Sequence, residues 1–245
     1  MKRVIILSLV CLAAFVSCQK MDHAVNQTIT YYPEITLASG ETVAHQVGTP
    51  WSDPGVTATL QGQDVTSQLK IEDTVDPDES GIYTVKYTFT NKDGFVRSAT
   101  RTVVVYDVAN ANDTDIAGTY QTTTYIRTKP DGTITSYNDA YGFACEEKIT
   151  AGPGTGLFFI QDLVCGLYEF YAGYGSAYAY KAFVLLNKDN SFSLLNGDDI
   201  DPWGDPIAFF EGGANYDPET GTITLDWTYP GVSKNKYTTT YADKK

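Results

Sequence analysis

The sequence predicts an all-β protein with two domains, a β-sandwich followed by an antiparallel β-barrel. Apolar residues do not recur at the i, i+3, i+4, i+7 spacing of an amphipathic helix in any long segment. Apolar and polar residues alternate with period two instead, and turn sequences such as NKDG at 91–94 and PDG at 130–132 separate the runs. The polar segment 107–115, which contains no aromatic residue, is the predicted division between the domains.

The chain begins with a segment that reads as a secretory signal peptide, residues 1–17. Two basic residues precede an uncharged run over residues 4–16, which is too short to cross a bilayer, because a helix needs about 20 apolar residues. The Ser17-Cys18 pair resembles the cleavage site of bacterial lipoproteins, and this resemblance implies a lipid on Cys18 and a flexible tether over 18–29. A secreted protein that is cleaved elsewhere and carries no lipid is the alternative.

Residues 30–107 are predicted to form a β-sandwich of short strands joined by turns. Residues 83–90 (YTVKYTFT) alternate strictly, and the turn that follows leads into a second run over 95–106, which predicts a β-hairpin. Tyr83 precedes Val85 by two residues. This is the spacing of a tyrosine corner in which valine replaces the usual cysteine.

The pattern over most of residues 30–107 resembles the bacterial immunoglobulin-like domains that follow signal peptides in surface lipoproteins. The resemblance is carried by Asp53-Pro54-Gly55-Val56, Gly81-x-Tyr83-x-Val85-x-Tyr87, Asp93-Gly94 and Arg101-Thr102-Val103. It implies an immunoglobulin-like sandwich that acts as a spacer, and it gives Trp51 a structural position. A spacer presents the next domain and performs no chemistry of its own.

After a linker over 108–115, residues 116–245 are predicted to form a barrel of roughly eight to ten short strands. The first strand-like run, IAGTYQTTTYI, and the last, KYTTTYADK, are expected to pair and close the barrel, which removes its sheet edges. Apolar residues alternate with threonine and aspartate over 222–229. This alternation places Trp227 in the predicted core.

Residues 165–180 (CGLYEFYAGYGSAYAY) carry six aromatic side chains. The four that follow the parity of a strand are Tyr168, Phe170, Tyr178 and Tyr180. These four are predicted to pack in the barrel wall, because alternate side chains of a strand point to opposite faces. Tyr171 and Tyr174 fall outside the alternation.

Residues 116–242 resemble the lipocalin-like C-terminal domains of outer-membrane lipoproteins associated with starch-utilisation-type glycan uptake. The resemblance is carried by Gly118-x-Tyr120, the Tyr-Gly cluster at 171–175 and Asp201-Pro202-Trp203-Gly204. It implies a lipocalin-like antiparallel barrel on an outer-membrane lipoprotein exposed at the cell surface, with an outer-membrane transporter complex as a partner. These related domains have no established activity, so the resemblance implies none for this chain.

The charge of the chain excludes several classes of partner. Its formal net charge is −13, and removal of residues 1–17 changes it to −15, because Lys2 and Arg3 leave and no acid leaves. Nucleic-acid binding depends on clustered basic residues, and outside the signal peptide the longest basic run is Lys244-Lys245. An anionic bilayer also repels such a chain, which leaves the lipid as its attachment to the membrane.

The sequence predicts no catalytic residues, no metal site and no cofactor. Both histidines, His23 and His45, precede the predicted barrel, which excludes a Ser-His-Asp, Cys-His or histidine-rich zinc site there. The carboxylates that suggest glycoside hydrolysis are Glu146, Glu147, Glu169 and Glu211, and a solvated acidic surface is the alternative. The aspartates that suggest calcium binding, without the spacing of an EF-hand loop, are Asp198, Asp199, Asp201 and Asp205.

Two cysteines, Cys145 and Cys165, remain once the signal peptide is removed and Cys18 carries a lipid. In an oxidising export compartment the two can form a disulfide, which contributes about 3 kcal/mol on the chain-entropy model. A hairpin that turns at Pro153-Gly154 does not place them opposite each other, so the bond requires a bulge or a neighbouring strand. Two separate buried thiols are the alternative.

Sugar binding is the hypothesis that the aromatic residues favour. Aromatic rings stack on the apolar faces of sugars, and carboxylates accept hydrogen bonds from hydroxyl groups. Trp203 is the leading candidate, because it stands beside Asp201 in the loop-like segment DDIDPWGDP. Tyr171 and Tyr174, at the glycine turn, are further candidates. The alternative is that Trp203 folds back as a plug on the end of the barrel.

These observations together predict a non-catalytic, lipid-anchored protein of the outer membrane, exposed at the cell surface, whose barrel binds a polysaccharide or oligosaccharide. Besides the membrane, an outer-membrane transporter complex is an expected partner. A structural or protein-partner module without glycan affinity is the second hypothesis. A small glycosidase that depends on Glu169 or Glu211 is the third.

Overall fold

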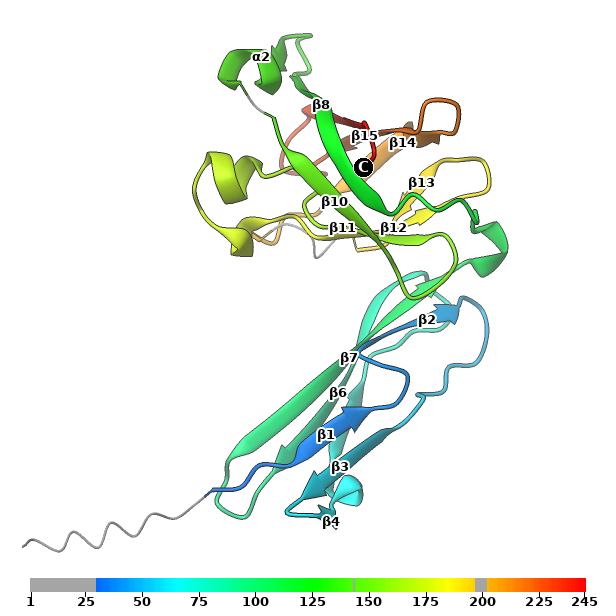
Figure 1. Ribbon diagram of the computed structural model, residues 1–245, viewed down its shortest axis with the longest axis vertical. Helices are drawn as coiled ribbons and strands as arrows, with labels where there is room; N and C mark the ends of the chain where they lie inside the picture. Colours follow the sequence, from blue (N-terminus) through cyan, green and yellow to red (C-terminus); the bar gives the residue numbers. More distant parts are fainter. Residues whose placement is uncertain (1–29, 143, 197–201) are drawn as a thin grey trace, which may run out of the picture. The chain divides into compact units, whose positions relative to one another are not determined.

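A computed structural model of the protein describes residues 30–142, 144–196 and 202–245 (Figure 1). The chain in these ranges is almost entirely β-structure, and its strands form three sheets. The prediction of an all-β protein with an immunoglobulin-like domain and an antiparallel barrel is therefore confirmed. Across the same residues, no helix has the length and apolar character that a membrane span requires.

Several predicted features lie outside the described residues. These are the signal peptide over 1–17, the lipid attachment residue Cys18, the tether over 18–29 and the candidate ligand Asp201. Asp198 and Asp199 lie outside them as well, so the calcium hypothesis for that acidic segment stays a prediction. The predicted domain boundaries also stay predictions.

The sandwich domain consists of two sheets. One has the strand order β1-β3-β4 and the other has the order β2-β7-β6-β5. The elements are β1 (Glu34–Leu37), β2 (Thr42–Gln46), β3 (Val56–Leu60), β4 (Gln63–Asp64), the 3-10 turn η1 (Thr66–Gln68), β5 (Lys70–Asp73), β6 (Gly81–Thr90) and β7 (Val96–Tyr106). Every pair is antiparallel except β2 with β7, which is parallel. The core lies between the two sheets and contains Val43, Val85, Tyr87, Val103 and Val105.

The predicted hairpin of this domain is confirmed, because β6 and β7 pair antiparallel over their length from Gly81↔Val105 to Thr90↔Val96. The tyrosine corner is also present: the Tyr83 hydroxyl donates a 3.0 Å hydrogen bond to the carbonyl of Glu79. Trp51 packs against the core, and its indole N–H donates to Oδ2 of Asp73 at 3.0 Å. These contacts are structural.

Arg101 is a fully buried charge on the core side of β7. Its Nε lies 3.0 Å from Oδ2 of Asp53, and the hydroxyl of Tyr87 donates to the same carboxylate. Its guanidinium also donates to the backbone carbonyls of Ala38, Gly40 and Gly55. A charge can be buried only when it is paired and hydrogen-bonded. The two sequence landmarks Asp53-Pro54-Gly55 and Arg101 are therefore parts of one network.

The second domain is a single antiparallel sheet with the strand order β13-β12-β11-β10-β8-β16-β15-β14, and β9 adds to β8 outside this path. Its strands are β8 (Gly118–Thr128), β9 (Ile134–Ser136), β10 (Glu146–Ala151), β11 (Leu157–Ile160), β12 (Ala182–Leu186), β13 (Phe192–Leu194), β14 (Ala208–Asp217), β15 (Thr222–Thr228) and β16 (Lys236–Ala242). Its helical turns are η2 (Val108–Asn110), α2 (Tyr137–Tyr141), the π turn η3 (Leu167–Tyr171) and the 3-10 turn η4 (Ser176–Tyr178).

The sheet curls into a nearly closed barrel (Figure 1). Its first and last long strands pair as predicted, from Thr128↔Lys236 to Gln121↔Ala242. At the opposite edge, a β-bridge joins Ser191 to Asn215, which brings the turn before β13 to β14. Closure in this way satisfies backbone groups that an open sheet edge would leave exposed.

The barrel interior is lined mainly by aromatic and branched side chains. Trp227 is fully buried, and its indole N–H donates to Oγ1 of Thr239 at 3.2 Å, so its predicted core position is confirmed. Trp227 also stacks on Tyr237 with ring centroids 4.4 Å apart. The interior is therefore a packed core.

Candidate functional site

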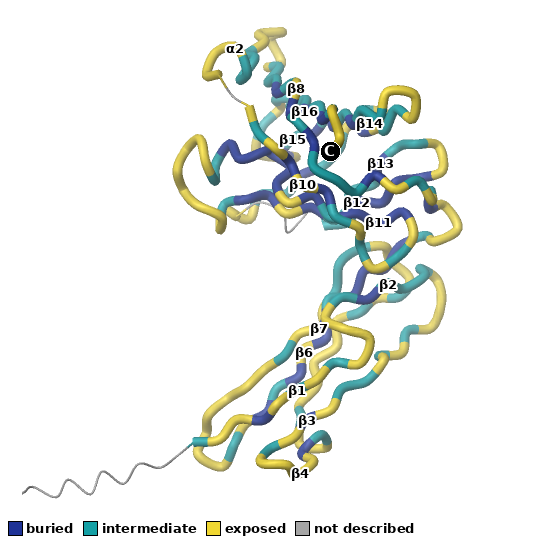
Figure 2. Tube along the Cα trace, in the orientation of Figure 1, coloured by how far each residue is buried: buried dark blue, intermediate teal, exposed yellow. Residues whose placement is uncertain are grey.

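The aromatic stretch over residues 165–180, called the aromatic loop below, connects β11 to β12. It contains the turns η3 and η4 and no strand, so the predicted strand alternation is wrong, and Phe170 is exposed. The predicted packing is confirmed for Tyr180, which is buried in the core, and for Tyr168, which packs against it. Strand parity applies only to extended backbone. Cys165, Gly166, Gly173 and Gly175 have positive φ angles, which break the extended conformation. Much of the loop is exposed (Figure 2).

Asp162 fastens both ends of the aromatic loop, and sequence reasoning missed it. Its carboxylate accepts hydrogen bonds from the N–H groups of Val164 at 3.1 Å and Gly166 at 2.8 Å. It also accepts one from Tyr180 at 2.9 Å. The side chain is 3% exposed. An aspartate that accepts hydrogen bonds from backbone N–H groups a few residues later is a known turn signal, which could have indicated the local bonds. The bond to Tyr180 spans the whole loop, so no local sequence pattern marks it.

A disulfide joins the loop to the start of β10. Cys145 and Cys165 are bonded, with Cα atoms 6.0 Å apart. Cys145 lies just before β10 and Cys165 lies in the turn after β11, so the bond crosses between loop segments. Glu147 lies within 4.8 Å of both sulfur atoms, but sulfurs that are bonded to each other provide no thiolate for a metal ion.

Trp203 lies among four tyrosines of the aromatic loop, a group that we call the Trp203 cluster. The distances from its ring centroid are 4.8 Å to Tyr168, 5.2 Å to Tyr178, 6.2 Å to Tyr180 and 6.3 Å to Tyr174. Tyr180 is fully buried, whereas Trp203 is 49% and Tyr174 57% exposed. The cluster therefore has a fixed base and an accessible aromatic surface.

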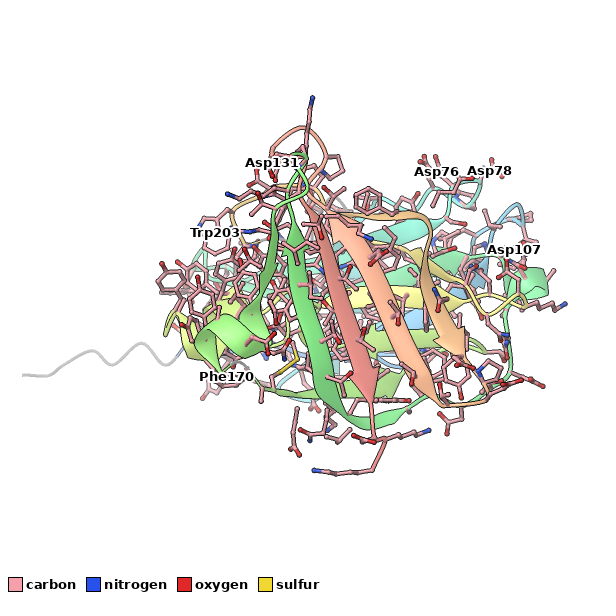
Figure 3. The ribbon with its side chains drawn as sticks, turned by 90° about the horizontal axis from the view of Figure 1, so that it is seen from above. Asp76, Asp78, Asp107, Asp131, Phe170 and Trp203 are labelled. Carbon is pink, nitrogen blue, oxygen red and sulfur yellow. A yellow bond between two sulfur atoms is a disulfide. The ribbon has the colours of Figure 1, made fainter. Side chains whose placement is uncertain are left out.

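Tyr171 belongs to a second group of rings. Its ring centroid lies 5.6 Å from that of Tyr141 in α2. Tyr141 in turn contacts Tyr137, which stacks on the buried Tyr125 at 4.7 Å. Phe170, next to Tyr171, is 73% exposed. Figure 3 shows Phe170 and Trp203 on the same side of the barrel, where α2 is also drawn.

Two cavities adjoin the aromatic loop. The larger, about 530 Å³, is lined by Gly142, Ala144, Cys145, Glu146, Cys165, Gly166, Phe170 and Tyr171. The second, about 420 Å³, is lined by Cys145, Glu146, Glu147, Lys148, Gln161, Asp162, Gly166, Glu169, Phe170, Ser176, Ala179 and Lys181. Both volumes fall within the usual range of ligand pockets, about 300 to 1,000 Å³.

Two buried carboxyl groups lie at the base of the second cavity. Burial raises the pKa of Glu147 to about 8 and that of Asp162 to about 6. Oε1 of Glu147 accepts a 2.9 Å hydrogen bond from the backbone N–H of Asp162. Glu147 is 2% exposed. Both carboxyl groups already accept hydrogen bonds from backbone N–H groups, so we interpret them as structural supports of the loop.

Three of the four acids predicted for hydrolysis, Glu146, Glu147 and Glu169, line the second cavity, and Glu211 lies elsewhere. Glu146 is exposed, accepts from Gln121 at 2.7 Å and pairs with Lys245. Glu169 is half-buried on η3 and lines the second cavity. Glu211 is exposed on β14 and lines a different cavity, beside β13. No distance between two of these carboxylates identifies a catalytic pair, so hydrolysis stays a prediction.

Family models match both parts of the chain. The description "Bacterial surface protein, Ig-like domain" applies to residues 35–105. A model of the BT2262-like C-terminal domain matches residues 109–242. No curated protein matches the chain.

Solved structures also show similarity. The lipoprotein BT2262 from Bacteroides thetaiotaomicron is 28% identical, with a TM-score of 0.44, over 86% of this chain and 100% of that chain. A structure of CBM51-2 in complex with GlcNAc and INT domains from Clostridium perfringens ZmpB is 14% identical, with a TM-score of 0.28, over 86% of this chain and 43% of that chain. TM-scores this low support no transfer of a binding site.

Proposed function

The chain belongs to the family of the BT2262-like C-terminal domain, and on this premise we propose that it is a lipid-anchored protein of the bacterial cell envelope that binds glycans. The Trp203 cluster is the observation that carries the binding part of the proposal. Trp203 and Tyr174 expose about half of their surfaces, while the buried Tyr180 and the half-buried Tyr168 hold their positions. A sugar would meet rings that are already oriented.

The chemistry of such a surface suits a sugar ring. One face of a pyranose presents C–H groups that pack on aromatic rings, and its hydroxyl groups form hydrogen bonds with polar side chains nearby. Rings that are held in place before binding lose little conformational entropy when the ligand arrives. The cluster meets this condition, because Tyr168 stacks on Tyr180 with ring centroids 5.4 Å apart.

Two further observations support a place in the cell envelope. The N-terminal match is to a bacterial surface protein domain, and the family's namesake is described as a lipoprotein. The Ser17-Cys18 pair supplies the cysteine that a lipid anchor requires. We place the protein at the outer face of the outer membrane, beside a glycan transporter that receives the bound chain. The proposal includes no catalytic step.

Affinity electrophoresis of the detergent-solubilised mature protein tests the binding part. Native gels would contain amylopectin, dextran, galactomannan, xylan or polygalacturonate. We expect at least one of them to retard the protein, and Trp203→Ala to abolish the retardation. Phe95→Ala is the matched control, because Phe95 is also 49% exposed and lies in the sandwich. Retardation by none of the polymers would remove glycan binding from the proposal.

A protein-partner module is the second candidate, and one observation favours it. Exposed tyrosine and tryptophan side chains are also enriched where proteins bind each other. In that case the Trp203 cluster would contact a subunit of an envelope complex. Crosslinking in intact cells from a photoreactive residue at position 174 would then yield a defined protein adduct, and no polysaccharide would retard the protein in native gels.

A further inference from the structure

The aromatic loop carries exposed rings at two places, and only one of them belongs to the Trp203 cluster. Phe170 and Tyr171 are 73% and 52% exposed and line the cavity beside the Cys145–Cys165 disulfide. We propose that this cavity is a second sugar-binding subsite, so that the ligand is a neutral glycan chain that spans both places. This inference rests on the proposed function, whose first subsite is the Trp203 cluster.

The two cavities beside the loop share four lining residues, and we call this pair of neighbouring cavities the groove. The shared residues are Cys145, Glu146, Gly166 and Phe170. The two cavities have volumes of about 530 and 420 Å³, and each alone falls within the size range of a whole small-molecule site. Together they offer more space than a single sugar ring fills.

The groove combines apolar and polar walls, as sugar recognition requires. The disulfide, Phe170 and Tyr171 form an apolar part against which the face of a sugar ring can pack. Side chains with hydrogen-bonding groups form the other part, and they are Lys148, Gln161, Glu169, Ser176 and Lys181. All of these except the half-buried Glu169 are exposed, so hydroxyl groups of a ligand can reach them.

The loop connects the groove to the Trp203 cluster over a short distance. Within η3, Tyr168 contacts Trp203, while Phe170 and Tyr171 line the groove. These residues belong to one turn of five residues. The other end of the loop also lies between the two places, because Tyr178 contacts Trp203 and the next residue, Ala179, lines the groove. Adjacent units of one chain can therefore occupy both subsites.

The negative charge of the protein indicates that the bound glycan is neutral. The formal net charge is −13, and the segment around Trp203 reads DDIDPWGDP. A polyanionic chain such as polygalacturonate would be repelled as it approaches. Neutral polysaccharides carry no such penalty.

Isothermal titration with size-fractionated oligosaccharides tests the inference. The fractions, from mono- to hexasaccharide, would be cut from the neutral polysaccharide that retards the protein in gels. We expect affinity to rise about tenfold or more with chain length as the second subsite is filled. Phe170→Ala should abolish this gain and leave the affinity for the shortest bound fragment unchanged. Phe95→Ala, the same substitution in the sandwich, should preserve the gain.

The outcomes separate the two proposals. If a monosaccharide binds as tightly as the hexasaccharide and Trp203→Ala still abolishes binding, the second subsite is wrong and the first stands. If Phe170→Ala keeps the full gain with chain length, the subsite is not at Phe170. If polygalacturonate alone binds, the ligand is not neutral. If no glycan binds, both proposals are wrong.

Discussion

Oδ1 of Asp162 accepts a 2.9 Å hydrogen bond from the backbone N–H of Tyr180, which lies 18 residues later in the chain. The N–H of Gly166, at the start of the aromatic loop, donates to Oδ2 of the same carboxylate at 2.8 Å. One buried side chain thus holds both ends of the loop. The geometry of the aromatic site depends on a residue that contributes no ring.

Asp162→Ala should destabilise the barrel and loosen the aromatic loop. The substitution leaves the buried N–H groups of Val164, Gly166 and Tyr180 without their acceptor, which should lower the free energy of unfolding by about 2 to 4 kcal/mol. Urea unfolding measures the loss, and amide hydrogen exchange over 164–180 should accelerate.

The matched control is Asp131→Ala. Asp131 also accepts a backbone hydrogen bond, from Thr133 at 2.8 Å, but it lies in an exposed turn, visible in Figure 3. Its loss should cost less than about 1 kcal/mol, because water can replace the acceptor. Equal effects of the two substitutions would show that Asp162 does not hold the loop.

The stability of the protein should decrease as pH rises from about 4 to about 8. Burial raises the pKa of Glu147 from 4.5 to about 8 and that of Asp162 from 3.8 to about 6. The folded state therefore binds these protons more tightly than the unfolded state, so their release on raising pH favours unfolding, by about 1 to 3 kcal/mol. Denaturant unfolding at a series of pH values measures the slope.

Glu147→Gln should flatten this pH dependence, because its amide does not ionise and its oxygen can still accept from the N–H of Asp162. Glu146→Gln is the neighbouring control: that carboxylate is exposed and its pKa is lowered by Lys245 and Gln121. It should leave the slope between pH 5 and 8 unchanged. A free energy of unfolding that rises over this range would contradict the prediction.

Arg101→Met should unfold the sandwich at a lower temperature. It removes the pairing of Arg101 with Asp53 and leaves three carbonyl groups without their donor. Breaking a buried pair costs about 3 to 5 kcal/mol. Calorimetry would show the shift in the transition of the sandwich. Arg97→Ala, an exposed arginine of the same strand, should shift it little, and equal shifts would refute the role of Arg101.

Reduction of the disulfide should destabilise the barrel by about 3 kcal/mol, because the bond closes a segment with a sequence separation of 20 residues. Urea unfolding with and without dithiothreitol measures the effect. The double variant Cys145→Ser, Cys165→Ser should match the reduced protein and should not respond to dithiothreitol. A response of the double variant would mean that the reductant acts elsewhere.

Local patterns predicted the strands well. The hairpin of β6 and β7, the pairing of β8 with β16 and the core position of Trp227 all follow from alternation and turn residues. Such patterns are properties of neighbouring residues, and the structure satisfies them because each strand has one buried face.

Long-range contacts could not be predicted in the same way. Strand parity placed Phe170 in a wall, whereas a π turn exposes it. The contact between Tyr171 and Tyr141 of α2 was not predicted from the sequence. Tyr174 does lie by Trp203, at 6.3 Å. The role of Asp162 depends on a partner 18 residues away, which no local motif marks.

The attachment of the aromatic loop has a consequence for how this family can change. The loop carries none of the paired strands of the barrel sheet, and Asp162 and the Cys145–Cys165 bond fix its ends. Its interior residues can therefore be exchanged without shifting the register of any strand. The strands of the barrel can therefore stay constant while the residues of the loop change.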